Sequence, residues 1–218
     1  MKLNKKLITV AIDSPGAAGA GTQAKLIAKE YNLFYLDTGK IYRYIGLLKL
    51  NHPKKFNYKF IRNKIKKLKM SELSKKNLLS EKVAISASII AKDKKIRKIV
   101  QTFQRKCAYF PPKKYLGSVL DGRDIITEQV KDAMFKFFIT ANLNVRAKRR
   151  FREYKLLNKK ITFKEVIKNL RNRDKSDKKR KHSPLKKTKD SILINTTKLS
   201  KKASFKKIKA IMDKKINN

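Results

Sequence analysis

The chain has little of several residue types, and each shortage excludes a class of protein. Its single cysteine, Cys107, leaves no internal disulfide framework and suits a reducing cytoplasm. No apolar run approaches the roughly 18 residues that a membrane-spanning helix needs. Two histidines and one cysteine, without paired spacing, predict no structural metal site. The 218 residues are enough for one sizeable domain, which we expect in the cytoplasm and without a membrane partner.

Acidic residues are also scarce, since 16 Asp and Glu stand against 59 Lys and Arg, a formal net charge of +43. Such an excess is typical of nucleic-acid-binding proteins. The lysines are scattered over every element and form no single block, so we interpret the charge as compositional and expect no specific nucleic-acid partner. Twelve of the cations are arginine, which leaves 59 − 12 = 47 lysines. The few arginines therefore indicate places where a planar, forked donor is required.

The chain is organised around ITVAIDSPGAAGAGT, residues 8–22. An apolar run ends at Asp13, and a Gly/Ala-rich loop then leads into a helical pattern. Such a loop can wrap backbone N–H groups around phosphates at a helix N-terminus, where the helix dipole favours negative charge. The P-loop of nucleotide enzymes has the pattern G-x-x-x-x-G-K-[ST]. The frame is present here, but Ala20 stands where the lysine belongs.

Short apolar runs alternate with helical patterns along most of the chain. We predict strands at 8–12, 33–36, 118–120, 134–139 and 191–194. Region 49–80 indicates one or two short helices and no strand pair. Strand, Gly-rich loop, helix, strand is the opening of a doubly wound sheet, whose ligands bind at the carboxyl ends of the strands. The fold class is therefore α/β, with a five-stranded, mostly parallel sheet flanked by helices.

Six segments in one order resemble the bacterial cytidylate kinase family, of the nucleoside monophosphate kinase group. They are DSPGAAGAGT (13–22), LDTGKIYR (36–43), segment 88–97, LDGRD (120–124), RAKRR (146–150) and RDKSDKKRKHSPL (173–185). The resemblance covers nearly the whole chain and implies a P-loop kinase fold in one domain, 1–218. It implies a core of 1–48, 83–154 and 186–218, a reduced CMP-binding insertion at about 49–82 and a lid at about 155–185.

The resemblance also implies an enzyme that phosphorylates CMP and dCMP with ATP and Mg²⁺. We expect a monomer, because the sequence contains no evident exposed apolar seam. The cation would be held mainly by nucleotide phosphates, without a protein metal site. The implied ATP-binding residues are Ser14, Pro15, Gly16, Ala17, Ala18, Gly19, Ala20, Gly21, Thr22 and Arg150. The implied CMP-binding residues are Thr38, Arg43, Ser88, Arg97, Arg123, Asp124, Arg173, Asp177 and Arg180. The implied catalytic residues are Arg123, Arg180 and Arg149.

The chain departs from the family's pattern at the P-loop, where Ser14 and Ala17 replace glycines and Ala20 replaces the lysine. Loss of a charge-stabilising donor from such a site typically costs about 10²- to 10³-fold in rate. In one explanation, another cation enters the site, and Lys40 and Lys25 are candidates. Lys40 occupies a position where the family commonly has a small or apolar residue. In the other explanation, the chain binds nucleotide but no longer turns it over.

Two alternative functions stay open on the sequence. AGAGTQAKLIAKEY (18–31) resembles the P-loop helix of adenylate kinases, so an adenylate-kinase-like enzyme is one alternative. The net charge and Ala20 together support the other, a catalytically inactive, basic nucleotide- or RNA-binding relic.

Overall fold

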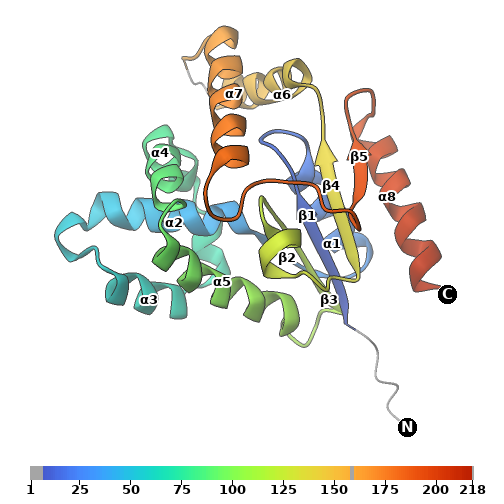
Figure 1. The fold of residues 1–218 in the computed structure, drawn as a ribbon, viewed down its shortest axis with the longest axis horizontal. Helices are drawn as coiled ribbons and strands as arrows, with labels where there is room; N and C mark the ends of the chain where they lie inside the picture. Colours follow the sequence, from blue (N-terminus) through green and yellow to red (C-terminus); the bar gives the residue numbers. More distant parts are fainter. Residues whose placement is uncertain (1–6, 158–159, 218) are drawn as a thin grey trace.

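The protein is described by a computed structural model over residues 7–157 and 160–217, and its centre is a five-stranded sheet (Figure 1). The strands are β1 (Ile8–Asp13), β2 (Phe34–Asp37), β3 (Gly117–Gly122), β4 (Phe135–Thr140) and β5 (Ile192–Asn195). Their order is β2-β3-β1-β4-β5, and every neighbouring pair is parallel. The five predicted strands are confirmed, and the sheet is parallel throughout.

The register brings the polar ends of three strands to one edge of the sheet. Asp13 pairs with Gly122, and Asp37 pairs with Asp121. β1 is covered on both faces, which explains its continuous apolar run. Because parallel strands end together, their carboxylates gather where a ligand of a doubly wound sheet binds.

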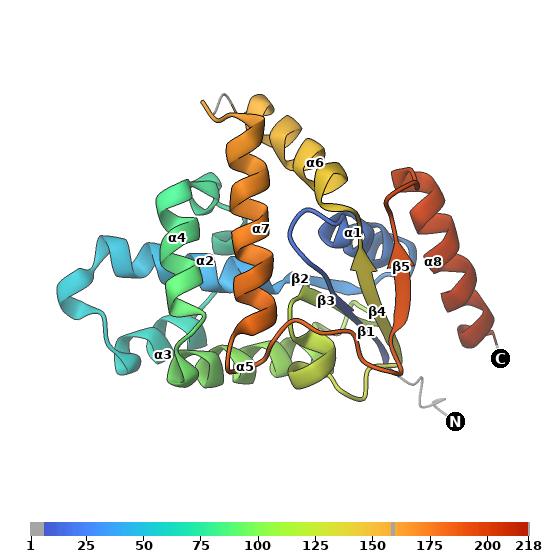
Figure 2. The same cartoon turned by 45° about the horizontal axis from the view of Figure 1, so that its top comes forward.

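Helices cover both faces of the sheet (Figures 1 and 2). On one face, α1 (Ala20–Glu30) and α8 (Lys201–Ile216) bury Ile27 and Ile208 against β1, β4 and β5. On the other face, α2 (Thr38–Asn51), α4 (Glu81–Ile90) and α5 (Lys94–Tyr109) form a second core. The chain thus has the layers expected of an α/β fold.

Region 49–82 is helical, as the sequence indicated. It holds α3 (Tyr58–Lys66) and the short 3-10 turns Pro53–Lys55, Met70–Ser74 and Lys76–Leu79. Ile61 and Leu78 lie in the same core as Ile41 of α2 and Ile96 of α5. The short insertion is therefore held by packing onto the helices around it, and the boundary predicted at residue 82 remains a prediction.

Two helices stand over the carboxyl edge of the sheet. These are α6 (Leu143–Leu156) and α7 (Phe163–Lys179), which bury Ala147 against Val166 and Leu170. In Figure 2, α7 rises between α4 and the loop that precedes α1. α7 lies within the predicted lid, where the sequence pattern indicated no helix. None of the helices within 7–157 and 160–217 is long and apolar enough to cross a membrane.

Candidate active site

The P-loop of this chain is a strained turn between β1 and α1. The Ser14 N–H donates to the carbonyl of Gly122 at 3.2 Å, which ties the loop to the end of β3. Gly19 caps α1 at φ 94°, and Ala17 has φ 60°. Both lie in the left-handed region, which glycine adopts freely and alanine does not. The replacement of glycine at position 17 therefore leaves strain in the phosphate loop.

Two arginines of α6 hold the P-loop from outside. The buried Arg146 donates to the carbonyl of Gly16 at 3.1 Å and to Asp174 of α7 at 2.6 Å. Arg149 donates to the carbonyl of Ala18 at 3.3 Å and to the hydroxyl of Thr196 at 2.9 Å. Burial lowers the pKa of Arg149 from its usual value. The loop's shape thus depends on α6, α7 and the segment after β5.

A cavity of about 380 Å³ opens between the P-loop, the start of α2 and α7. A larger, mostly apolar hollow of about 950 Å³ lies between α3 and α5 and contains no P-loop residue. Most of the predicted site residues line the smaller cavity: Ala17, Gly19, Ala20, Gly21, Thr22, Thr38, Arg43, Ser88, Arg97, Arg123, Asp124, Arg150, Arg173, Asp177 and Arg180. The predicted residues that do not line it are Ser14, Pro15, Gly16, Ala18 and Arg149.

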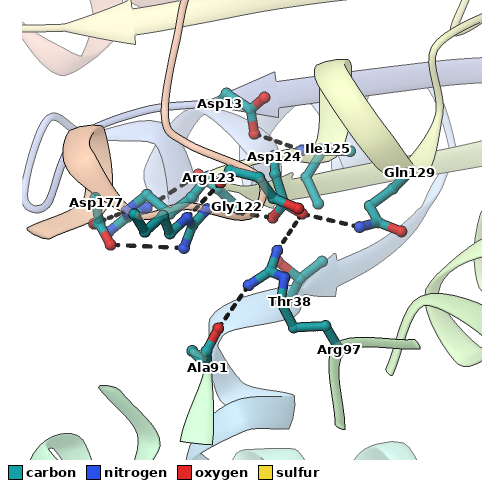
Figure 3. Close-up of polar contacts among 12 residues, drawn as sticks. Asp13, Thr38, Ala91, Arg97, Gly122, Arg123, Asp124, Ile125, Gln129 and Asp177 are labelled. Carbon is teal, nitrogen blue, oxygen red and sulfur yellow. Dashed lines mark hydrogen bonds and ion pairs between the residues drawn. The ribbon is translucent and has the colours of Figure 1, made fainter. Parts of the chain in front are cut away.

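A buried ion pair between Arg97 and Asp124 lines this cavity, and Figure 3 shows the pair with its neighbours. Arg97 contacts Oδ2 of Asp124 and donates to the carbonyl of Ala91 at 3.0 Å. Gln129 donates to the same carboxylate oxygen at 3.0 Å. The ring of Tyr42 lies 5.7 Å from the Arg97 guanidinium. A buried pair is tolerated when its other polar atoms find partners. Ala91 and Gln129 supply two of them, and Nε of Arg97 is left without a partner among the described residues.

Three arginines converge on Asp177 of α7. Arg123 donates to it at 3.0 Å, Arg173 lies at 3.9 Å, and Arg180 lies at 3.7 Å. The positive charge of Arg123, more than burial, lowers the pKa of Arg173 to about 10. One carboxylate among so many cations leaves an excess of positive charge in the cavity. That excess fits the phosphates of a nucleotide, which guanidinium groups bind bidentately.

Buried carboxylates support the floor of the site. Asp13 is fully buried and accepts the N–H groups of Ile125 and Ile126 at 2.8 and 3.0 Å, which anchors the π-helical turn Ile125–Gln129 after Asp124. Burial raises the pKa of Asp13 to about 7. Burial, and then repulsion by Asp37, raises the pKa of Asp121.

Asp121 and Asp37 are the carboxylates best placed to hold a cation beside the P-loop. Oδ2 of Asp121 lies 3.4 Å from where a Cβ on Gly21 would stand. Its Oδ1 is buried and has no hydrogen-bond partner among the described residues. Across 7–157 and 160–217, no group of three or more His, Cys, Asp or Glu is arranged to hold a metal by itself. Any divalent cation here would draw most of its ligands from elsewhere.

Sequence reasoning missed several residues that shape the site. Gln129 and Tyr42 surround the Arg97–Asp124 pair, and Asp174 and Thr196 position the arginines of α6. Gln129 and Thr196 lie outside the six segments that resemble the family, whereas Tyr42 lies within LDTGKIYR and Asp174 within RDKSDKKRKHSPL, without a role implied for them. The LDGRD segment gave a further local signal, because Asp121 lies within it.

A phosphate loop at the start of a helix, facing an arginine-lined cavity at the carboxyl edge of a parallel sheet, defines a P-loop kinase. The family model for cytidylate kinase matches residues 10–214. The chain is 40% identical to a cytidylate kinase of Bartonella tribocorum over 92% of each chain, and 35% identical to one of Clostridium botulinum over 95% of this chain and 98% of that one. The chain therefore belongs to the cytidylate kinase family.

A solved structure supports the fold. The crystal structure of an uncharacterized protein from Eubacterium ventriosum matches with a TM-score of 0.55 and 17% identity, over 94% of this chain and 98% of that one. At this identity the likeness concerns only the architecture.

Proposed function

We propose that this chain transfers the γ-phosphoryl group of ATP to CMP and dCMP, forming ADP and the cytidine diphosphate. The Arg97–Asp124 pair, at the end of a cavity that also contains the P-loop, carries the proposal. A phosphate oxygen of CMP bonds to the γ-phosphorus, and the bond from that phosphorus to the β,γ-bridging oxygen breaks. ADP leaves with the bonding electrons, and no covalent enzyme intermediate forms.

The polar groups around Asp124 suit cytosine. Cytosine presents an amino donor, where uracil presents a carbonyl acceptor. Oδ1 of Asp124 has Arg180 as its ion-pair partner at 3.8 Å, which is too long for a hydrogen bond, so it can accept from the amino group. Nε of Arg97 is buried without a partner in the described structure and can donate to a ring acceptor, with exposed Ser88 nearby on the cavity wall. A uracil carbonyl would meet the carboxylate and be repelled.

The arginine cluster suits the phosphate and sugar of CMP. Arg43, Arg123 and Arg180 would hold the phosphate, and Arg173 with Asp177 would contact the sugar hydroxyls. Burial lowers the pKa of Arg43, and its guanidinium donates to the carbonyl of Leu78 at 2.8 Å. That bond aims the guanidinium before substrate arrives. Thr38 is also proposed to contact CMP from the cavity wall, and its hydroxyl donates to the Asp121 carbonyl at 2.7 Å, which fixes the side chain.

ATP would bind with its phosphates on the backbone N–H groups of residues 14–22. Arg150, which pairs with Glu153 at 2.9 Å, and Arg149 would contact it from α6. Arg123, Arg180 and Arg149 are the proposed catalytic residues, because their charges stabilise the transferring phosphoryl group. Segment 155–185, which contains α7, would act as the lid that excludes water and protects ATP from hydrolysis.

Mg²⁺ completes the proposed site, because it neutralises charge on the β- and γ-phosphates when bound. The unpartnered Oδ1 of Asp121, with Asp37 beside it, fits a cation held through water. Nucleotide phosphates and water would supply the other ligands. We further propose that the protein acts as a monomer in the cytoplasm.

The test is a coupled ADP-release assay with ATP, Mg²⁺ and one acceptor at a time. We expect CMP and dCMP to have a higher kcat/KM than UMP and AMP. AMP as the best acceptor would favour the adenylate-kinase-like alternative and contradict the base assignment. No turnover, together with tight and salt-sensitive RNA binding, would support the relic instead.

A further inference from the structure

The site lacks the cation that P-loop enzymes place on the phosphate loop. Ala20 is the first residue of α1, and the residue is 4% exposed, within the core that contains Ile27. Phosphoryl transfer depends almost entirely on positioning and on neutralising charge between the β- and γ-phosphates. A working site therefore needs a cation from another element.

Each arginine that lines the cavity has at least one oxygen partner, which for Arg43 is the carbonyl of Leu78, although Nε of Arg97 and Nη2 of Arg180 form no hydrogen bond within the described ranges. Arg97 and Arg180 contact Asp124, Arg123 and Arg173 contact Asp177, and Arg150 contacts Glu153. Three lysines also line it, namely Lys25, Lys40 and Lys92. Within the described ranges, the ammonium groups of these three have no hydrogen-bond or ion-pair partner.

The positions of the three lysines separate their roles. Lys92 follows α4 next to Ala91, whose carbonyl binds Arg97, so it lies at the end where the base would bind. Lys25 lies one turn after Gly21 on α1, and helical side chains point back toward the N-terminus. Its charge acts on the buried Asp121, whose pKa it lowers against the larger effect of burial. We therefore assign Lys25 to the charge balance of Asp121 at the floor of the site.

Lys40 lies in the first turn of α2 and lines the same cavity as the phosphate loop. Its N–H donates to Oδ1 of Asp37 at 3.3 Å, which caps the helix. Asp37 lies in register with Asp121, and Asp121 approaches Gly21 at the start of α1. The two helix starts therefore flank one strand end. Lys40 precedes Arg43 by three residues, so it shares the helix face that carries this cavity-lining arginine.

We propose that Lys40 supplies the phosphate-binding cation that Ala20 lacks, by reaching from the start of α2 to the β- and γ-phosphates of ATP on the P-loop. The inference rests on the proposed function. Lysine suits this role because its ammonium group is a compact charge on a flexible stem. Lys40 is half-buried, so little solvent would separate its charge from the phosphates. Lys40 donates hydrogen bonds to phosphate oxygens and transfers no proton.

The experiment compares kcat and the KM values of ATP and CMP for wild type, Lys40→Ala, Ala20→Lys and the double variant. Lys40→Ala should lower kcat by about 10²- to 10³-fold, as expected for a lost charge-stabilising donor. The KM of CMP should change little. Ala20→Lys should restore much of the loss in the double variant, because it returns a cation to the same phosphates. Lys49→Ala, at the other end of α2, is the matched control and should behave as wild type.

The outcomes separate this inference from the proposed function. Wild-type turnover of CMP that Lys40→Ala leaves unchanged would overturn the role of Lys40 alone. The same holds if Lys25→Ala, and not Lys40→Ala, causes a loss that Ala20→Lys restores. A loss in Lys40→Ala that Ala20→Lys does not restore would point to disturbed folding and would also overturn it. Absence of wild-type turnover with every acceptor would refute the proposed function, and the role of Lys40 with it.

Discussion

Outside the cavity, we expect the largest loss of stability from removing the buried guanidinium of Arg146. The Arg146 residue is 6% exposed, and its guanidinium donates to the carbonyls of Ala141 at 2.9 Å and Gly16 at 3.1 Å and to Asp174 at 2.6 Å. One side chain therefore joins the end of β4, the P-loop and α7. The change Arg146→Met keeps an unbranched apolar stem and removes all three hydrogen bonds.

The expected loss in the free energy of unfolding depends on the groups that lose their partner, which are the Asp174 carboxylate and two backbone carbonyls. Removal of one partner of a buried ion pair costs about 3–5 kcal/mol. The Asp174 side chain is 16% exposed, so water reaches it and we expect the lower end, about 3 kcal/mol. Two carbonyls lose a donor, which adds about 1 kcal/mol in all. Arg146→Met should therefore lower the free energy of unfolding by about 4 kcal/mol.

Urea unfolding measures this loss, with the m value checked for constancy between variants. The double variant Arg146→Met with Asp174→Leu removes both charges, and paired replacement by apolar groups is often close to neutral. We expect the two losses to be strongly non-additive, by about 2–3 kcal/mol. Arg152→Met, exposed on the same helix, should change stability by less than about 0.5 kcal/mol. Additive losses, or a loss below about 1 kcal/mol for Arg146→Met, would refute the reasoning.

Three further predictions concern the base end, the phosphate loop and the sheet. Asp124→Asn gives a donor to the base and should shift kcat/KM from CMP toward UMP by about 1–3 kcal/mol; an unchanged ratio in the coupled assay contradicts the base assignment. Ala17→Gly relieves about 1–2 kcal/mol of left-handed strain against about 0.4–1 kcal/mol of added unfolded-chain entropy, so Tm should rise, and a fall would show that φ 60° is not strained. Burial raises the pKa of Asp13 from 3.8 in the unfolded chain to about 7 in the folded protein. Between these two pH values the folded state binds more protons than the unfolded state, so the stability of the protein falls as pH rises. The stability of wild type relative to Asp13→Asn should thus fall by up to about 4 kcal/mol from pH 4 to 7 in urea titrations, and a rise would contradict the pKa shift.

Local patterns predicted most of the fold. Each strand is a short apolar run, and the Gly/Ala-rich loop between Asp13 and the first helix is typical of a P-loop. α7 was missed because, among its 17 residues, only Val166 and Leu170 are buried, which leaves a weak apolar periodicity. A signal was nevertheless present, since Thr162 and Glu165 form a capping box at its start. A lysine-rich helix with few buried positions is not detected by a search for apolar residues at helical spacing.

The sequence by itself determined the strands, the phosphate loop, the family and part of the residues that line the cavity, because each depends on contacts within one element or on a contiguous motif. Only the tertiary structure decided which charges pair. Arg146 meets Gly16 across 130 positions, and Asp13 meets Ile125 across 112. Lys40 lines the same cavity as the P-loop, and it follows β2, whose end is in register with the end of β3. Such contacts depend on how distant elements return to one sheet edge, and no local periodicity encodes that.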